Sequence, residues 1–191
     1  MNNTTKYKLT IIFIFMSLIS GIIGFSLMTN FINDVPVKNN VKEKVQSPCT
    51  TCVYVSKTDR VNKLQNPILN ISIYKDSKLI KEFDGVSGRY NTQLLDRHTS
   101  GNESPSPNGE YIIGTPTKGI VYETGGVFLP YEPQFITNRT HLGAHWDPSW
   151  ELNNGEDGTS GCLAVKTLTE YNELVKLIQT NNIKSLIINN V

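Results

Sequence analysis

The feature that most constrains this chain is an uncharged segment near its N-terminus. Residues 9–32 contain 24 consecutive uncharged residues, of which 16 are large and apolar. A helix of the first 20 would be about 30 Å long, which matches the hydrocarbon core of a bilayer. Lys6 and Lys8 precede the segment, as in the n-region of a secretory signal. We therefore predict a membrane-spanning segment at 9–32, with residues 1–8 in the cytoplasm.

The same segment predicts the compartment of everything that follows it. The best small-x-small exit, at residues 24–26, is weak, so we favour an uncleaved signal anchor, with a cleaved signal as the alternative. The sequence has no second run of 18 or more apolar residues, which excludes a protein with several spans. We expect a single-pass protein of the cytoplasmic membrane whose remaining part is extracytoplasmic, in the periplasm or cell wall.

The chain after the membrane segment divides into a tether and a domain. Residues 33–67 begin with a polar stretch that contains prolines, typical of a tether. From residue 68 to 191 the pattern becomes one of short β segments between turns rich in Gly, Pro, Asn and Asp. Segments 71–74 and 78–83 flank a turn at 75–77 and predict a hairpin. The other candidate strands are 110–114, 119–123, 134–138, 162–165 and 185–189.

One stretch of the domain is predicted to be helical. Residues 167–170 (Thr-Leu-Thr-Glu) form a capping-box pattern, and apolar residues repeat after it at i, i+3, i+4 and i+7: Tyr171, Leu174, Val175 and Ile178. The predicted fold is therefore mainly β, a sandwich or mixed sheet with one substantial helix near the C-terminus, preceded by the N-terminal membrane helix.

Charge and cysteine content exclude several classes of protein. The 18 basic and 17 acidic residues give a net charge of +1, so we expect no nucleic-acid partner. Cys49 and Cys52 form C-x2-C, and His141 and His145 form H-x3-H, but 88 residues separate the two halves, unlike a zinc finger. We expect no metal site. The cysteine pair sits in the tether, which favours a local disulfide or two idle thiols over a redox centre.

The third cysteine lies in a turn suited to nucleophilic catalysis. Cys162 ends the segment Gly-Thr-Ser-Gly-Cys at 158–162 and precedes an apolar strand. Glycines allow a sharp turn, and the successive amides of this turn, which contains Ser160 and Gly161, are candidates for an oxyanion hole. A free thiol is only a few per cent ionised at neutral pH, so it needs a base. His145, 17 residues upstream, is the candidate, although a buried cysteine and a surface histidine would give the same spacing.

His145, a polar loop and the sequence Thr-Ser-Gly-Cys at 159–162 together resemble the signature of the L,D-transpeptidase (YkuD-like) catalytic domain family. Residues 104–111 (Ser-Pro-Ser-Pro-Asn-Gly-Glu-Tyr) resemble the family's Thr-Pro-x-Gly-x-Tyr/Phe segment. The resemblance covers about 68–190. It differs from the family at Ser160, where a second histidine is usual, and at Ala164, where an arginine often follows the cysteine.

The resemblance implies a function in the cell wall. Cys162 would be the nucleophile and His145 the base of a peptidoglycan L,D-transpeptidase, with the amides of Gly161 and Cys162 helping to hold the oxyanion. Such an enzyme acts on stem peptides, releases a terminal D-amino acid and needs no cofactor. Arg139 and Trp146 are candidate substrate-binding residues. The alternatives are an L,D-carboxypeptidase-type hydrolase on the same fold, or a non-catalytic, membrane-tethered wall-binding protein.

Overall fold

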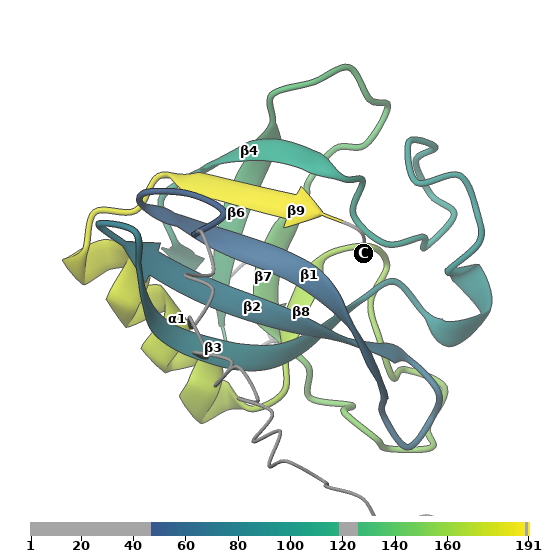
Figure 1. Ribbon diagram of the computed structural model, residues 1–191. Coiled ribbons are helices and arrows are strands. Elements are labelled where there is room, and N and C mark those ends of the chain that lie inside the picture. Colours follow the sequence, from purple (N-terminus) through teal and green to yellow (C-terminus); the bar gives the residue numbers. More distant parts are fainter. Residues whose placement is uncertain (1–46, 119–125, 190) are drawn as a thin grey trace, which may run out of the picture. The chain divides into compact units, whose positions relative to one another are not determined.

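The computed structural model describes residues 47–118, 126–189 and 191, so the membrane segment at 9–32 and the candidate strand at 119–123 lie outside the described residues. No helix in the described part of the chain is long and apolar enough to span a membrane. The elements of that part (Figure 1) are β1 (Cys52–Val61), β2 (Pro67–Lys75), β3 (Lys78–Ser87), η1 (Tyr90–Thr92), β4 (Gly109–Ile113), β5 (Thr117–Lys118), β6 (Val127–Pro133), β7 (Gly143–Trp146), β8 (Leu163–Val165), α1 (Leu168–Thr180) and β9 (Ser185–Asn189).

The predicted hairpin is confirmed as β2 and β3, which pair antiparallel. The turn between them consists of Asp76 and Ser77, whose φ angles are 50° and 60°. Two central residues with positive φ are characteristic of the tight turns whose twist matches that of the flanking strands. The hairpin has a neighbouring strand on each side, because β1 pairs with β2 and β8 pairs with β3.

The sheet closes on itself, which corrects the predicted sandwich. Neighbouring strands follow the order β4-β9-β1-β2-β3-β8-β7-β6, and β6 pairs back with β4, so eight strands form a closed barrel. The pairs β1–β9 and β7–β8 are parallel and the other neighbours antiparallel. Closure leaves no open edge in this ring. The predicted mainly β fold with one helix near the C-terminus is confirmed.

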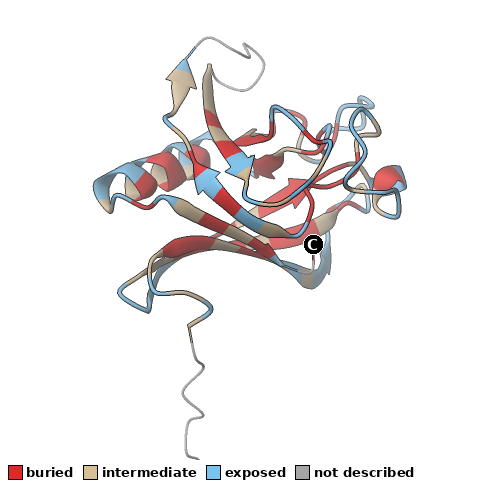
Figure 2. Cartoon of the chain, turned by 90° about the horizontal axis from the view of Figure 1, so that it is seen from above, coloured by how far each residue is buried: buried red, intermediate tan, exposed pale blue. Residues whose placement is uncertain are grey.

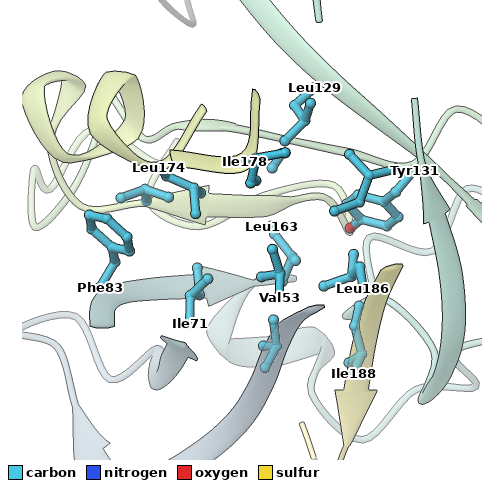
Figure 3. Packing of buried hydrophobic residues seen from close by; sticks show 14 of the residues in the cluster. Val53, Ile71, Phe83, Leu129, Tyr131, Leu163, Leu174, Ile178, Leu186 and Ile188 are labelled. Atoms are coloured by element: carbon cyan, nitrogen blue, oxygen red, sulfur yellow. The ribbon is translucent and has the colours of Figure 1, made fainter. Parts of the chain in front are cut away.

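The helix α1 forms as its sequence predicts and packs on the core of the barrel. Thr167 is the N-cap, and its side chain accepts a hydrogen bond from the Glu170 amide. The four predicted apolar residues are buried, and buried and exposed positions alternate around α1 (Figure 2). Leu174 and Ile178 lie over the apolar residues of the strands (Figure 3). Burial of each such side chain contributes about 1.5–3 kcal/mol.

The barrel begins earlier in the chain than the sequence indicated. Residues 52–67, assigned to the tether, form β1 and the turn into β2. The second half of β1 is polar and mostly exposed, and only its first half supplies core residues, Val53 and Val55. The segment therefore lacks the sustained alternation of a half-buried strand. The predicted strand at 134–138 is wrong, because β6 ends at Pro133 and the chain then turns.

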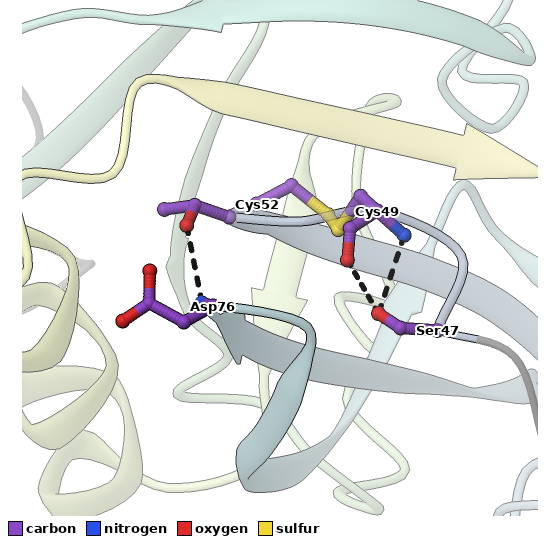
Figure 4. Close-up of a disulfide and its surroundings, with 5 residues drawn as sticks. Ser47, Cys49, Cys52 and Asp76 are labelled. Carbon is purple, nitrogen blue, oxygen red and sulfur yellow. Dashed lines mark hydrogen bonds between the residues drawn. A yellow bond between two sulfur atoms is a disulfide. The ribbon is translucent and has the colours of Figure 1, made fainter.

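Cys49 and Cys52 are joined by a disulfide (Figure 4), as one of the favoured sequence interpretations predicted. The loop that it closes lies against the β2–β3 turn: the Ser77 amide donates to the Thr50 carbonyl at 2.7 Å, and the Asp76 amide donates to Thr51 Oγ1 at 3.3 Å. The disulfide thus fixes the start of β1 against the hairpin. Paired in this way, neither cysteine offers a thiolate to a metal.

Candidate active site

The parallel strands β7 and β8 bring His145 and Cys162 together. Their register pairs Ala144 with Leu163 and His145 with Ala164, and Cys162 directly precedes β8. Paired residues share a face of a sheet and successive residues alternate, so His145 and Cys162 project from the same face. Ala144 and Leu163 project from the other face, into the core. Two residues along and one strand across separate the two Cα atoms by about 8 Å.

Both side chains line one cleft. Its volume is about 800 Å³, and its remaining lining residues are Thr117, Phe128, Pro130, Tyr131, Glu132, Pro133, Arg139, Thr140, His141 and Leu142. Several of these are apolar or aromatic, and most belong to β6 or to the segment that leads from β6 into β7. A largely apolar hollow with a few convergent polar groups is the usual form of a small-molecule or peptide site.

The hydrogen bonding of His145 leaves one ring nitrogen free to act as a base. Its Nδ1 lies 2.8 Å from the backbone oxygen of Trp146. A carbonyl oxygen can only accept, so Nδ1 carries the proton and Nε2 keeps its lone pair in the neutral ring. Burial lowers the pKa of His145 below its ordinary value of 6.5, and the bond to Trp146 opposes this. His145 is therefore neutral at neutral pH.

Cys162 rests as a protonated thiol. Burial raises its pKa above the ordinary value of 9.0, while a hydrogen bond from the backbone of Gly143 and the charge of Arg139 act in the opposite direction. Its Sγ also lies 3.9 Å from the His141 carbonyl oxygen. A neutral thiol and a neutral imidazole that line one cleft can form a pair in which the base takes the proton only as the nucleophile attacks.

Thr159, which the sequence analysis gave no role, organises the turn before the cysteine. Its Oγ1 accepts hydrogen bonds from the amides of Gly88 at 2.9 Å and Gly161 at 3.0 Å, and donates to the Cys162 carbonyl at 2.7 Å. The amide of Gly161, predicted as an oxyanion donor, is thereby already occupied. The sequence signal for Thr159 was its place in the Thr-Ser-Gly-Cys motif.

Arg139 supports the turn from the other side. The residue is only 6% exposed. Its Nη1 donates to the Ser104 carbonyl at 3.1 Å and to Ser104 Oγ at 2.9 Å, and its Nη2 donates to the Ser160 carbonyl at 3.2 Å. Within the described ranges no carboxylate forms a salt bridge with it. Arg139 lines the cleft, as expected of a substrate-binding residue, but most of its contacts hold backbone.

The other two predicted site residues do not line the cleft. Trp146 contributes its backbone oxygen to His145, while its ring packs against the core, as the alternation along β7 requires. Ser160 is exposed, and its Oγ lies 3.4 Å from a carboxylate oxygen of Glu103. Neither side chain reaches the thiol. Trp146 was predicted as a site residue because it lies beside His145 in the sequence. Successive residues of a strand face opposite sides of the sheet, so the two side chains point in opposite directions.

Comparisons with known proteins show no family. No family model matches the chain, and no curated protein matches it. A solved structure described as "Structure of Bdellovibrio bacteriovorus Bd1075" aligns with a TM-score of 0.44 and 15% sequence identity. The alignment covers 74% of this chain and 48% of that one, so the match spans about half the length of the neighbour.

Proposed function

We propose that the protein is an L,D-transpeptidase that acts on the stem peptides of peptidoglycan, with Cys162 as nucleophile and His145 as base. The substrate is the amide that joins an L-centre to a terminal D-amino acid. His145 Nε2 takes the thiol proton as Cys162 Sγ bonds to the carbonyl carbon. The C–N bond then breaks, and the amine of the departing D-amino acid takes that proton from His145.

The second half of the reaction regenerates the enzyme. An amine of a neighbouring stem peptide attacks the thioester and gives a proton to His145 Nε2, the C–S bond breaks, and the thiolate that leaves takes that proton from His145. The sequence of proton transfers needs one base with a free nitrogen and no cofactor.

One observation carries this proposal. Two neighbouring parallel strands present a cysteine and a histidine from one face into a single cleft, with the histidine held by its other nitrogen. This is the arrangement of a nucleophile, a base and a group that orients the base. The resemblance of residues 104–111 and 159–162 to the L,D-transpeptidase family supports the same reaction. It also supports the proposal that this barrel is an L,D-transpeptidase-like fold.

The proposed location is outside the cytoplasm, anchored to the cytoplasmic membrane through residues 9–32. The disulfide between Cys49 and Cys52 supports it, because disulfides persist in oxidising compartments and are rare in the cytosol. Peptidoglycan stem peptides are found in that same place.

The test is product analysis with the intact chain. Purified tetrapeptide stems are incubated with the protein, with and without a second stem as acceptor, and the products are identified by mass spectrometry. Release of the terminal D-amino acid together with cross-linked dimers supports the transpeptidase. Release with free tripeptide alone identifies the hydrolase instead. Absence of any product, with Cys162 shown to be intact, refutes both and leaves the wall-binding alternative.

A further inference from the structure

The carbonyl group that precedes the cysteine is held by two buried hydroxyl groups. Ser87 Oγ, at the end of β3, donates to the Gly161 carbonyl oxygen at 3.2 Å. Ser106 Oγ, in the loop before β4, donates to the same oxygen at 2.6 Å. The two serines are 3% and 0% exposed, so water does not compete for these bonds. Two side chains far apart in sequence thus converge on one peptide group.

A third residue completes this network and sets its direction. The Ser106 amide donates to Ser87 Oγ at 2.9 Å, which leaves the Ser87 proton for Gly161. Ser106 Oγ lies 2.7 Å from the Tyr131 hydroxyl, and since the only Ser106 hydroxyl proton points to Gly161, Tyr131 is the donor. Burial raises the pKa of Tyr131 far above its ordinary value, so the phenol keeps the proton that it donates.

The orientation of this peptide group decides where the Cys162 amide points. None of the described peptide bonds is cis, and in a trans peptide the C=O and N–H point in opposite directions. Holding the Gly161 oxygen toward the serines therefore directs the Cys162 N–H away from them. Among the turn and side-chain hydrogen bonds of the described residues, none occupies this amide, whereas Thr159 occupies that of Gly161.

We propose that Ser87, Ser106 and Tyr131 are positioning residues that hold the Cys162 amide as the donor for the oxyanion formed when Sγ attacks a carbonyl group. The inference rests on the proposed cysteine acyl transfer. Negative charge develops on the carbonyl oxygen of the tetrahedral intermediate, and a pre-oriented N–H stabilises it without reorganisation. Tyr131 also lines the cleft, whereas Ser87 and Ser106 do not, and in this role all three act through one peptide group.

Two reactions of the Cys162 thiol distinguish an effect on the oxyanion donor from an effect on the accessibility of the thiol. Acylation of Cys162 by p-nitrophenyl acetate passes through an oxyanion: the C–S bond forms, the ester C–O bond breaks, and p-nitrophenolate leaves. Alkylation by iodoacetamide displaces iodide at carbon and forms no oxyanion. Both rates are measured on the intact chain, with Cys162→Ala as the blank; Cys49 and Cys52 are already paired. The test remains valid even if stem peptides are not the substrate, since neither reagent resembles one.

In the double variant Ser87→Ala/Ser106→Ala we expect acylation to fall by about tenfold or more, since loss of one oxyanion donor costs about 10²–10³ in rate. Alkylation should change less than about twofold, because thiol ionisation is untouched. In Tyr131→Phe the acylation rate should fall by less, again with little change in the alkylation rate. Ser106→Thr should retain acylation. Ser72→Ala, which removes a buried hydroxyl on β2 bonded to Glu82, is the control and should change neither rate.

The proposal is overturned if acylation is unchanged in the double variant, or if acylation and alkylation fall together. Thermal melting establishes that each variant is folded before its rates are compared. If the double variant does not fold, the ratio of the acylation rate to the alkylation rate is compared in Ser106→Ala and Tyr131→Phe instead. Failure of the wild-type protein to process stem peptides would instead refute the proposed function and leave this ratio unaffected.

Discussion

Gly161 has no side chain, and two features of its position require this. Its φ angle is +113°, where residues with a Cβ are strained. An added Cβ would also lie 1.7 Å from Arg139 Nη2 and 2.7 Å from the Ser104 carbonyl oxygen. The residue before Cys162 is thus fixed by a buried cation and by the backbone of another loop. Thr159, Ser106 and Arg139 act on the turn in the same indirect way.

We predict that Gly161→Ala destabilises the protein and removes most of the thiol reactivity. Strain at this φ costs about 1–3 kcal/mol, and displacement of Arg139 adds to it. Gly155→Ala is the matched control: its φ is also positive, +81°, but a Cβ there would have nothing within 4 Å. Urea denaturation measures the free energy of unfolding of both variants, and the rate of alkylation by iodoacetamide measures their thiol reactivity. Equal costs for the two variants would show that Arg139 does not constrain the turn.

We predict that the pH profile of acyl transfer is set by a neutral pair. The pKa of His145 is lowered from 6.5 and that of Cys162 is raised from 9.0, so both are uncharged at pH 7. Activity should therefore be lost only as pH falls below about 6.5, where the base becomes protonated. His145→Ala should react slowly and recover as pH rises toward the thiol pKa.

His141→Ala is the control for that profile, because its ring contacts Thr140 and we assign it no proton transfer. Its profile should follow the wild type. A wild-type acid limb centred well above pH 6.5, measured as kcat/KM on stem peptides, would contradict a neutral resting pair. It would favour a preformed thiolate and imidazolium instead.

At the scale of elements, the sequence predicted the elements that are determined by residues close together in the chain. The cap at Thr167 with its apolar repeat predicted α1, and the turn at 75–77 predicted the β2–β3 hairpin. The sequence analysis did not predict β1, β5, β6 or β7. The second half of β1 is polar and mostly exposed, and β5 has only two residues. The strand β6 joins β4 to β7 and therefore depends on residues outside its own segment. β7 has only four residues, and its sequence, Gly-Ala-His-Trp, becomes a strand between β6 and β8.

The loop at the start of β1 gives a prediction at this scale. Changing Cys49 and Cys52 both to serine should cost about 2 kcal/mol, because the loop is short and its closure removes little chain entropy. Cys52 is 1% exposed, so a buried hydroxyl adds to the cost. Neither cysteine lines the cleft, so turnover should stay within about threefold once the variant is folded. Loss of all turnover in the folded variant would indicate a redox role for the pair.

At the scale of the whole molecule, the closure of the barrel could not be predicted from the sequence. It depends on β4 pairing with both β9 and β6, and no periodicity within a strand specifies its neighbours. Cys162 and His145 could be proposed as a pair from the sequence because they are chemically distinctive and lie 17 residues apart. Ser87 and Tyr131 were not, since they reach the turn only through the folded barrel.

The topology of the whole chain is also testable. We predict that a reporter fused after Val191 is active outside the cytoplasm and remains in the membrane fraction, because residues 9–32 are long and apolar enough to anchor it. Fractionation and activity of the fusion measure this. A soluble reporter with a new N-terminus between residues 20 and 35 would show that the segment is cleaved, and an inactive, cytoplasmic one would contradict the orientation.

The most direct test of the central claim is the mass of the intact protein, quenched in acid during turnover of a tetrapeptide stem. We predict that wild-type protein gains the mass of the stem without its terminal D-amino acid, held as a thioester on Cys162. Cys162→Ala should gain nothing and release no D-amino acid, since the chain has no other unpaired cysteine. Release of D-amino acid by Cys162→Ala, or the same adduct on that variant, would contradict the account.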